Sequence, residues 1–577
     1  MYYFGMRSLT LLLFIIIFIL FMMQVIMGIT EGFSIPTATL SLLIVEKGNI
    51  PLPHILEQKF KLWSLKPWSW NSAVKTEAYY PFPALLLAIL SITTQIPIWL
   101  VVLLPINGVA RVLIIYAIVS SLLLTKKDKK GALFVISFSI YAVYIVLSRY
   151  AVHTIGRGIL GVTLVGLFIY VVIFQALTIN SRFKSAVLIA LFSIAAIFTY
   201  YTAVTAILSI SFFAIISFLR RGSANAVLTI VIPLVISLAG VLYTHIYNIA
   251  MTMTRHYNFT FYNILKHMLD SVLSSLGLLK GESYIRYYSY LFDDPIYRLL
   301  HSFELTLKVL IIIAVLASAL LFVARLISGK GLNVSDMHYL FFAFLLVSSE
   351  LGEIPYLLVT PTVPTRFILF YGSITIVYLI TKLYKLYSAT HKHRYKYSNR
   401  SLFILIIILL QLLLIAASSF WLYKDLTYGH TYTTPFSYHR AMLDGLFIAR
   451  FYPIGEKLRI LSDVSYSSYI FLSLLRYDNT MAFFSQIYIG PFIDLLSHAR
   501  KDNPVNLKNF EEELKRRGVN GIVIPIFKRV IGGDIWGWNA KPSELMHLVV
   551  HSSENLSTHF SIIYSSSYSI YVHSLTS

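Results

Sequence analysis

The sequence predicts a polytopic α-helical membrane protein with a small α/β domain at its C-terminal end. Of the 577 residues, 57% are hydrophobic and only 13% are charged, whereas soluble domains average about 25% charged residues. A mean hydropathy of +0.73 leaves too little polar side chain to cover several soluble domains. Apolar runs as long as a bilayer span recur along residues 1–424, and the composition becomes that of a soluble domain over residues 425–577.

The apolar segments account for about eleven spans. The first is residues 8–28, an uncharged run long enough to cross a hydrocarbon core of about 30 Å. We interpret it as a retained helix rather than a signal peptide, because no small-residue cleavage motif follows it. The further spans lie near residues 99–124, 131–148, 159–179, 185–200, 202–219, 225–248, 304–327, 338–352, 368–386 and 402–423.

The placement of basic residues predicts the orientation of these spans. Clusters of Lys and Arg follow the second, fourth, sixth, eighth and tenth spans, on the same side as Arg7. The positive-inside rule assigns that side, and the N-terminus, to the cytoplasm. The chain is therefore expected in the cell membrane, with the C-terminal domain outside the cytoplasm. A net charge of +21 that flanks the membrane suits anionic lipids as partners and argues against nucleic acid.

Two long loops are expected on the outer side. Residues 29–98 form the first, with an interfacial helix over the Trp- and Lys-rich residues 55–70 and an interfacial or re-entrant helix over residues 81–97. Residues 81–97 could instead be an ordinary span, but a second crossing there would invert the charge pattern downstream. Residues 249–303 form the second loop.

The C-terminal domain has the patterns of both strands and helices. Residues 459–464 and 519–527 are predicted as strands, and residues 560–573 as a hairpin around a serine turn. Residues 506–518 are predicted as an amphipathic helix that ends at Gly518. The absence of cysteine excludes disulfides and thiolate chemistry.

Glu31 is the first candidate for chemistry, because it follows the first span directly and is the only acidic residue before Glu46. A carboxylate at this level can meet a lipid headgroup on one side and a water-borne acceptor on the other. It could accept a proton from an acceptor hydroxyl or hold a divalent cation. The alternative is a solvated carboxylate that closes the helix.

Four features occur together in this chain. An acidic residue ends the first span, the long outer loop ends in YYPFPALLLAILS (79–91), many alternating spans follow, and the outer domain ends in IYSSSYSIYVH (563–573). In this combination the chain resembles the GT-C superfamily of membrane glycosyltransferases, most of all the protein-mannosyltransferase and aminoarabinose-transferase branch and its archaeal relatives. The resemblance implies inverting transfer of a sugar from a polyprenyl-phosphate donor to a protein, lipid or glycan acceptor at the outer face. It also implies that Glu31 is the catalytic base or the ligand of a divalent cation, Mg²⁺ or Mn²⁺.

Two departures from the superfamily narrow this expectation. The short outer loop after the third span, RYAVHTIGRG (149–158), holds no carboxylate, so a metal site of two carboxylates is not favoured. The Trp-Trp-Asp-Tyr-Gly signature of oligosaccharyltransferases is missing, and IWGWNA (535–540) is the nearest string. Transfer to asparagine is therefore not favoured either.

A polyprenyl-phosphate donor needs cations at the outer interface, because its phosphate gains charge as the sugar leaves. Arginine suits this role by bidentate pairing. The candidates at the outer ends of spans are Arg157, Arg255 and Arg366, with His153 on the helical face of Arg157. Snorkelling to the interface is the alternative for each arginine.

Three more carboxylates lie on the outer side as candidate acceptor or metal contacts. Glu77 precedes the YYPFP segment, and Glu350 and Glu353 end the ninth span, where they either face the cavity of Glu31 or meet water. Tyr200 and Tyr201, between two spans, are expected as interfacial anchors.

Two rival functions stay open: a lipid or solute transporter or flippase, and a catalytically silent scaffold. Acidic residues gather at one face and are almost absent from the middle of the spans, which favours surface chemistry over transport.

Overall fold

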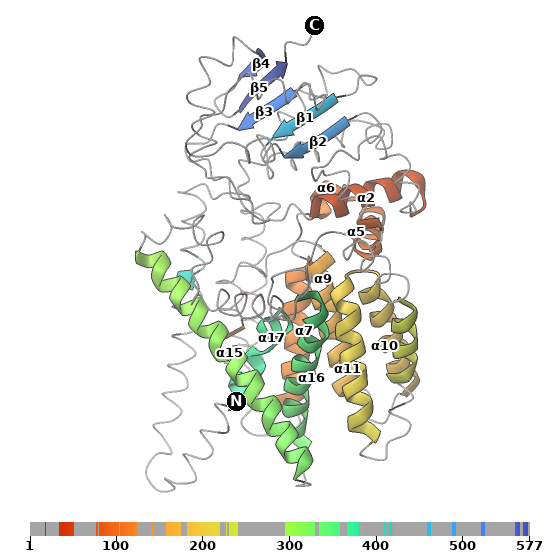
Figure 1. Cartoon of the computed structure of the whole chain (residues 1–577), viewed down its shortest axis with the longest axis vertical. Helices are drawn as coiled ribbons and strands as arrows, with labels where there is room; N and C mark the ends of the chain where they lie inside the picture. Colours follow the sequence, from red (N-terminus) through yellow and green to blue (C-terminus); the bar gives the residue numbers. More distant parts are fainter. Residues whose placement is uncertain are drawn as a thin grey trace, which may run out of the picture.

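The computed structural model describes helices in the membrane part of the chain and strands near its C-terminal end (Figure 1). The described residues are 34–50, 80–102, 106–123, 157–174, 182–219, 230–240, 295–328, 334–357, 366–379, the strands between 458 and 574, and short pieces at 15, 18, 77–78, 104, 140–141, 227, 382 and within 409–419. The first span, the interfacial segment 55–70 and the helix 506–518 lie wholly or almost wholly outside this part of the chain.

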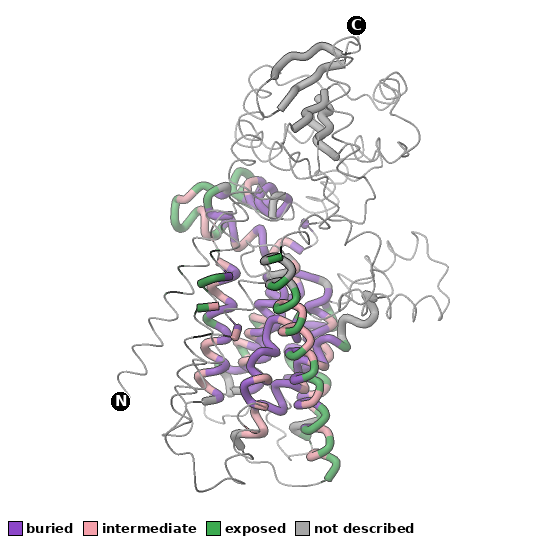
Figure 2. The backbone as a smooth tube through the Cα atoms, turned by 90° about the vertical axis from the view of Figure 1, so that its left-hand side faces the viewer, coloured by how far each residue is buried: buried purple, intermediate pink, exposed green. Residues whose placement is uncertain are grey.

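A bundle of apolar helices forms the main body of the described chain. Its members are α7 (Ile106–Leu123), α9 (Arg157–Phe174), α10 (Arg182–Ile197), α11 (Tyr201–Leu219), α15 (Pro295–Ile327), α16 (Val334–Leu357) and the short α17 (Arg366–Tyr371). Helix α16 packs against both α11 and α15, and α9 packs against α7, α10 and α11. Figure 2 shows the buried residues in the middle of this bundle.

The bundle has an apolar outside and small polar residues inside. On α15, Leu310, Ile313, Leu316 and Leu320 recur at helical spacing and are all exposed, while Ser318 on the other side is buried. Buried serines also occur on α11, α16 and the helix after α17, namely Ser211, Ser348, Ser349 and Ser373. Small polar residues allow close helix packing in a bilayer, whereas the exposed leucines and isoleucines suit contact with acyl chains.

Two predicted spans are interrupted in the structure. The span at 99–124 consists of α6 (Ile98–Val101) and α7. The sequence between them contains Pro105, a residue type that cannot donate a backbone hydrogen bond to a preceding turn. The span at 368–386 begins with α17, which ends in a turn at Gly372 before helix resumes over residues 373–379. Gly372 has no room for a side chain, because a Cβ there would overlap the carbonyl oxygen of Ile368 and methyl groups of α15.

The other helices begin or end a few residues from the predicted spans, and α15 differs most. It begins at Pro295, inside the predicted outer loop 249–303, and has 33 residues. At about 1.5 Å per residue it is longer than the bilayer core requires. Residues 302–327 are the one described helix that is both long and apolar enough to cross a membrane; the other apolar helices described are shorter.

The loop predicted at residues 29–98 contains two described helices, α2 (Ser34–Lys47) and α5 (Phe82–Thr94). Helix α2 was not predicted. Helix α5 lies within the predicted interfacial segment 81–97, and its 13 residues span about 20 Å, too short for a bilayer core of about 30 Å. It ends at Gln95, which has a left-handed backbone with φ of 58°.

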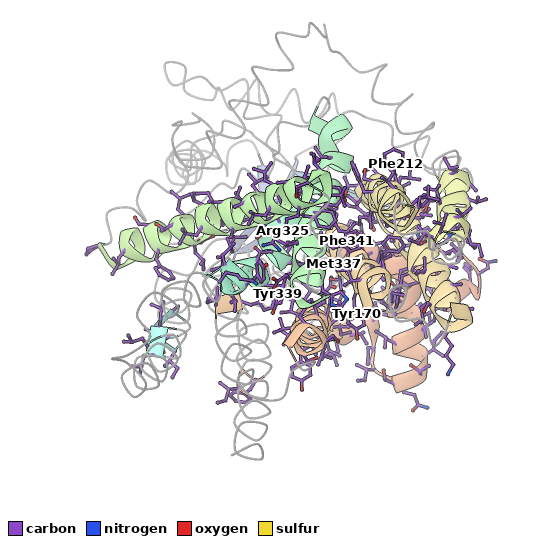
Figure 3. The ribbon with its side chains drawn as sticks, turned by 90° about the horizontal axis from the view of Figure 1, so that it is seen from below. Tyr170, Phe212, Arg325, Met337, Tyr339 and Phe341 are labelled. Carbon is purple, nitrogen blue, oxygen red and sulfur yellow. The ribbon has the colours of Figure 1, made fainter. Side chains whose placement is uncertain are left out.

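At the end of the bundle away from α2, α5 and α6, charged side chains link α15, α16 and Lys382. Asp336, at the start of α16, pairs with Lys382 and lies 4.0 Å from the guanidinium of Arg325, near the end of α15. The rings of Tyr339 and Tyr378 stack beside this network. Figure 3, viewed from below, labels Arg325 and Tyr339 on the two crossing helices. These cations lie at the end predicted to be cytoplasmic.

Five strands form one mixed sheet in the C-terminal region. Their order is β2 (Ile487–Pro491), β1 (Leu458–Ser462), β3 (Gly521–Pro525), β5 (Ser569–Ser574) and β4 (Phe560–Ser565). Strand β1 is parallel to both of its neighbours, and β5 is antiparallel to β3 and β4. The two predicted strands and the hairpin are confirmed, while β2 was not predicted. In Figure 1 the sheet lies beyond the end of the bundle that carries α2, α5 and α6.

Candidate functional site at the end of the bundle nearest the sheet

Several helix ends meet at the end of the bundle nearest the sheet. Helices α9 and α17 begin there, and α10 connects there to α11 through a tight tip at residues 198–200. Thr199 and Tyr200 donate their backbone N–H groups to the carbonyl of Ala196, and the Thr199 hydroxyl bonds the carbonyl of Ala195. The tip is therefore fixed by its own hydrogen bonds.

Among the predicted cations, Arg366 is the one whose side chain the structure describes at this end. It is the first residue of α17, and its side chain is exposed. Its Nη1 donates a hydrogen bond of 3.1 Å to the Tyr200 hydroxyl, and its Cζ lies 5.7 Å from the centre of the Tyr200 ring. A guanidinium held in this way on an exposed rim can receive an anion from outside the bundle.

Tyr200 is buried, so the expectation that it is an interfacial anchor is wrong. Only 8% of its surface is exposed, because it lies against two glycines of α9. A Cβ at Gly161 would be 2.9 Å from the Cβ of Tyr200, and a Cβ at Gly158 would be 3.4 Å from Nη1 of Arg366. Gly161 therefore makes room for the tyrosine, whereas a Cβ at Gly158 would be in ordinary van der Waals contact with Arg366 and Tyr200.

Glu350 is buried, so the predicted alternative in which it meets water is wrong. Its side chain is 6% exposed, and its Oε1 accepts the backbone N–H of Ile368 at 2.8 Å. Ile368 is in the first turn of α17, where N–H groups have no partner inside the helix. A carboxylate there satisfies a donor and interacts favourably with the helix dipole. Glu350 thus holds the helix that begins with Arg366.

Glu77 is also buried, at 3% exposure. Its Oε2 accepts a hydrogen bond of 3.0 Å from the hydroxyl of Thr37 on α2. Ser41, one turn later on α2, bonds the carbonyl of Ala84 on α5. The carboxylate is therefore part of the packing between α2 and the YYPFP segment.

The remaining candidates are described only in part. Glu31, His153 and Arg255 lie outside the described residues, as does the first outer loop between residues 51 and 76. Arg157 is the first residue of α9 and Glu353 is in the last turns of α16, but the orientation of these two side chains is not defined. Arg157 precedes Gly158, which places its backbone beside the Arg366 and Tyr200 pair.

No group of three or more His, Cys, Asp or Glu side chains gathers within the described part of the chain. Glu77 and Glu350, the buried outer carboxylates, bond to Thr37 and to the N-terminus of α17, respectively. These residues do not make a ligand set for Mg²⁺ or Mn²⁺.

A buried arginine in α7 was not predicted from the sequence as a functional candidate. Arg111 is 0% exposed; its Nε donates to the hydroxyl of Thr163 on α9 at 3.1 Å, and that hydroxyl donates to the amide oxygen of Asn107 at 2.8 Å. Its Cζ lies 4.3 Å from the ring centre of Phe370 on α17. An arginine inside an apolar segment is itself a signal in the sequence, since such residues are expensive in a bilayer.

Three solved structures that are similar to this chain come from two kinds of protein. The oligosaccharyltransferase of Archaeoglobus fulgidus, in a complex with Zn and sulfate, is 12% identical with a TM-score of 0.38. The match covers 77% of this chain but only 59% of that protein. ArnT from Cupriavidus metallidurans matches in its apo state with 11% identity, a TM-score of 0.42 and 98% coverage of both chains. The same protein bound to undecaprenyl phosphate matches with 10% identity and a TM-score of 0.45, over 99% of this chain and 98% of ArnT.

The three similar structures are members of the GT-C superfamily, which is the superfamily that the sequence resembles. No family model matches the chain, and no curated protein matches it. At identities of 12% or less and TM-scores of 0.45 or less, none of these likenesses identifies a reaction for this chain.

Proposed function

We propose that the chain is a GT-C-like membrane glycosyltransferase that moves a sugar from a polyprenyl-phosphate donor to a protein, lipid or glycan acceptor at the outer membrane face. The observation that carries the proposal is the exposed guanidinium of Arg366 at the rim of an apolar helix bundle. Tyr200 holds it from one side, and Glu350 caps the helix on which it lies. A phosphate becomes more negative as the sugar leaves, and a fixed guanidinium stabilises that charge.

The position of Arg366 suits a donor with a lipid tail. The exposed outer faces of α10, α11 and α15 are apolar, so an isoprenoid chain can lie along the bundle while its phosphate stays at the rim. Arg157, Arg255 and His153 belong to neighbouring outer segments in the proposed topology and would add positive charge around the same phosphate. Glu353 would contact the acceptor or help to orient it, and the buried Glu77 would act through the packing of α2 against the YYPFP segment.

The proposed reaction is a direct displacement. An acceptor hydroxyl attacks the anomeric carbon, Glu31 takes the proton of that hydroxyl, and the bond from the carbon to the phosphate oxygen breaks. The polyprenyl phosphate leaves with the bonding electrons, and the configuration at the anomeric carbon inverts. The proposed protein crosses the membrane about eleven times, with its N-terminus in the cytoplasm. Residues 425–577 form an outer α/β domain that positions the acceptor.

Glu31→Gln tests the proposal in the purified full-length chain supplied with polyprenyl-phosphate-linked hexoses. Loss of a general base lowers the rate by about 10²–10⁴-fold, so we expect transfer to fall by that factor while donor binding persists. Glu46→Gln is the matched control, because Glu46 is the next acidic residue and is exposed at the end of α2. Full transfer by Glu31→Gln would remove this residue from the mechanism. No transfer from any donor by the unmodified chain would favour the silent scaffold.

A transporter or flippase is the second candidate function, and Arg111 is the observation that favours it. An arginine buried among α7, α9 and α17 is a charged group inside an apolar bundle, and such groups often mark the path of an ion or substrate. Proteoliposomes loaded with a fluorescent polyprenyl phosphate would report movement of that lipid between leaflets. Movement by the unmodified chain that is lost in Arg111→Met, without sugar transfer, would support transport in place of transfer.

A further inference from the structure

We propose that Tyr200 is the positioning residue for the donor-phosphate arginine, and that the tip at residues 198–200 links this arginine to the YYPFP segment. The inference rests on the proposed function, because it concerns how Arg366 binds a polyprenyl phosphate. It goes further by assigning a role to a buried tyrosine that the sequence suggested only as a membrane anchor.

The first step is the contact between Tyr200 and Arg366, which are 166 residues apart in the chain. The tyrosine hydroxyl accepts from Nη1, and its ring lies 5.7 Å from Cζ of the same guanidinium. Arginine side chains have several rotatable bonds, and fixing them costs conformational entropy. A guanidinium that is already oriented by a buried partner loses less entropy when an anion binds, and therefore binds it more tightly.

The second step is that Tyr200 is itself held rigidly. Its backbone N–H bonds the carbonyl of Ala196, and its own carbonyl accepts from Ala203 in the first turn of α11. Its side chain lies against Gly161, where a Cβ would come within 2.9 Å of it, and beside Gly158. A tyrosine enclosed in this way has one side-chain position, so the hydroxyl that receives Arg366 is fixed in space.

The third step joins the tip to the segment proposed to face the acceptor. The backbone N–H of Phe82, the first residue of α5, donates to the carbonyl of Phe198 at 3.0 Å. The N-terminal N–H groups of a helix have no partner within the helix, so this bond fixes the start of α5 to the tip. Residues 198 and 200 thus contact the two segments that the proposed reaction must bring together, α5 and α17.

The test measures binding of undecaprenyl phosphate to the purified full-length chain in nanodiscs. Tyr200→Phe keeps the ring and removes only the hydroxyl that accepts from Arg366. We expect a dissociation constant about tenfold higher than that of the unmodified chain. Tyr339→Phe is the matched control, because this tyrosine stacks on Tyr378 at the opposite end of the bundle. It is expected to leave binding unchanged.

A double-mutant cycle separates positioning from a general structural role. If Tyr200 acts through the guanidinium, Tyr200→Phe adds no further loss of affinity in an Arg366→Ala background. Gly161→Ala moves Tyr200 without removing its hydroxyl, and is expected to weaken binding only when Arg366 is present. Equal binding by the unmodified chain and Tyr200→Phe, or a tenfold loss that persists without Arg366, would overturn the inference.

Three further probes distinguish the ligand chemistry. Inorganic phosphate and phosphatidylglycerol vesicles test for any phosphate and any anionic lipid, and undecaprenol tests for the tail alone. Selective binding of undecaprenyl phosphate supports the inference. Failure of the unmodified chain to bind undecaprenyl phosphate would overturn the proposed function, and the positioning role with it. Loss of binding in Arg366→Ala but not in Tyr200→Phe would overturn the positioning role and leave the proposed function standing.

Discussion

Glu350 illustrates how burial decides what a single carboxylate can do. From the sequence it is one of two acidic residues at the end of a span, facing either a catalytic cavity or water. In the structure it accepts the N–H of Ile368 and is almost fully buried. This contact joins residues 18 positions apart across two helices. No local pattern in the sequence distinguishes it from a contact with solvent.

Because Glu350 accepts the N–H of Ile368 at the start of α17, two substitutions of Glu350 should lower the stability by different amounts. In Glu350→Gln, an amide oxygen can still accept from Ile368, so only the charge–dipole contribution of about 0.3–1 kcal/mol is lost. Glu350→Ala leaves the helix N-terminus without this acceptor and should cost about 1–3 kcal/mol. Thermal unfolding of the purified chain measures the order, and binding of undecaprenyl phosphate should weaken mainly in the alanine variant. Abolished sugar transfer in a stable Glu350→Gln protein would instead make Glu350 a catalytic residue.

The residues of the candidate site differ in how far the sequence could reveal them. Arg366 follows from charge and topology alone, because an arginine at the outer start of a span is a simple one-dimensional signal. Tyr200 does not, because its role depends on Gly158 and Gly161 on one helix and on Arg366 far along the chain. Aromatic residues at helix tips usually lie in the interface, whereas here Gly161 leaves space for the buried ring.

At the scale of helices, the sequence predicts where most elements lie but not where they break. Hydropathy averages over many residues, so the span at 99–124 looks continuous although it consists of the two helices α6 and α7. Helix α2 was not predicted, because its sequence, SIPTATLSLLIVEK, is rich in small polar residues. Those residues are there for packing: Thr37 and Ser41 bond Glu77 and Ala84 across the contact with the YYPFP segment. A helix whose polar residues are buried has no usual amphipathic pattern.

The junction of α7, α9 and α17 gives a prediction at this scale. Arg111 bonds Thr163 on α9 and lies over Phe370 on α17, four residues from Arg366. Arg111→Met should therefore destabilise the bundle by about 1–2 kcal/mol, since polar contacts in a bilayer contribute up to about that much. Arg111→Lys keeps the charge but loses the planar group that stacks on the ring, so it should recover only part of the stability. Thermal unfolding measures both variants.

A cycle with Phe370→Leu isolates the stacking contribution. If the contact between the guanidinium and the ring matters, the two substitutions together cost less than the sum of their separate effects. Thr163→Val is the matched control for the hydrogen bond, because it removes the hydroxyl and keeps a similar volume. Strictly additive effects of Arg111→Met and Phe370→Leu would show that the ring contact contributes nothing to the junction.

At the scale of the whole molecule, the placement of basic residues predicts one orientation. The described cations Arg325 and Lys382 lie at the end of the bundle opposite Arg366. The sheet lies beyond the end that carries Arg366 in Figure 1. Strand β3 could be predicted because it is continuously apolar, and the β4–β5 hairpin could be predicted because apolar and polar residues alternate along it. The strand order β2-β1-β3-β5-β4 could not, because it depends on pairing between distant segments.

The absence of cysteine allows a direct test of this orientation, because any single cysteine variant reports one position without background. Leu299→Cys and Ser328→Cys place a thiol near the two ends of α15, at residues that are both exposed. We expect a membrane-impermeant maleimide added to intact cells to label Leu299→Cys, and to label Ser328→Cys only after permeabilisation. Ser574→Cys, at the end of β5, should label together with Leu299→Cys. The reverse pattern would invert the topology and move Arg366 to the cytoplasmic face, where the proposed outer-face transfer is impossible. Labelling of Ser574→Cys together with Ser328→Cys would place the sheet and Arg366 on opposite sides of the membrane.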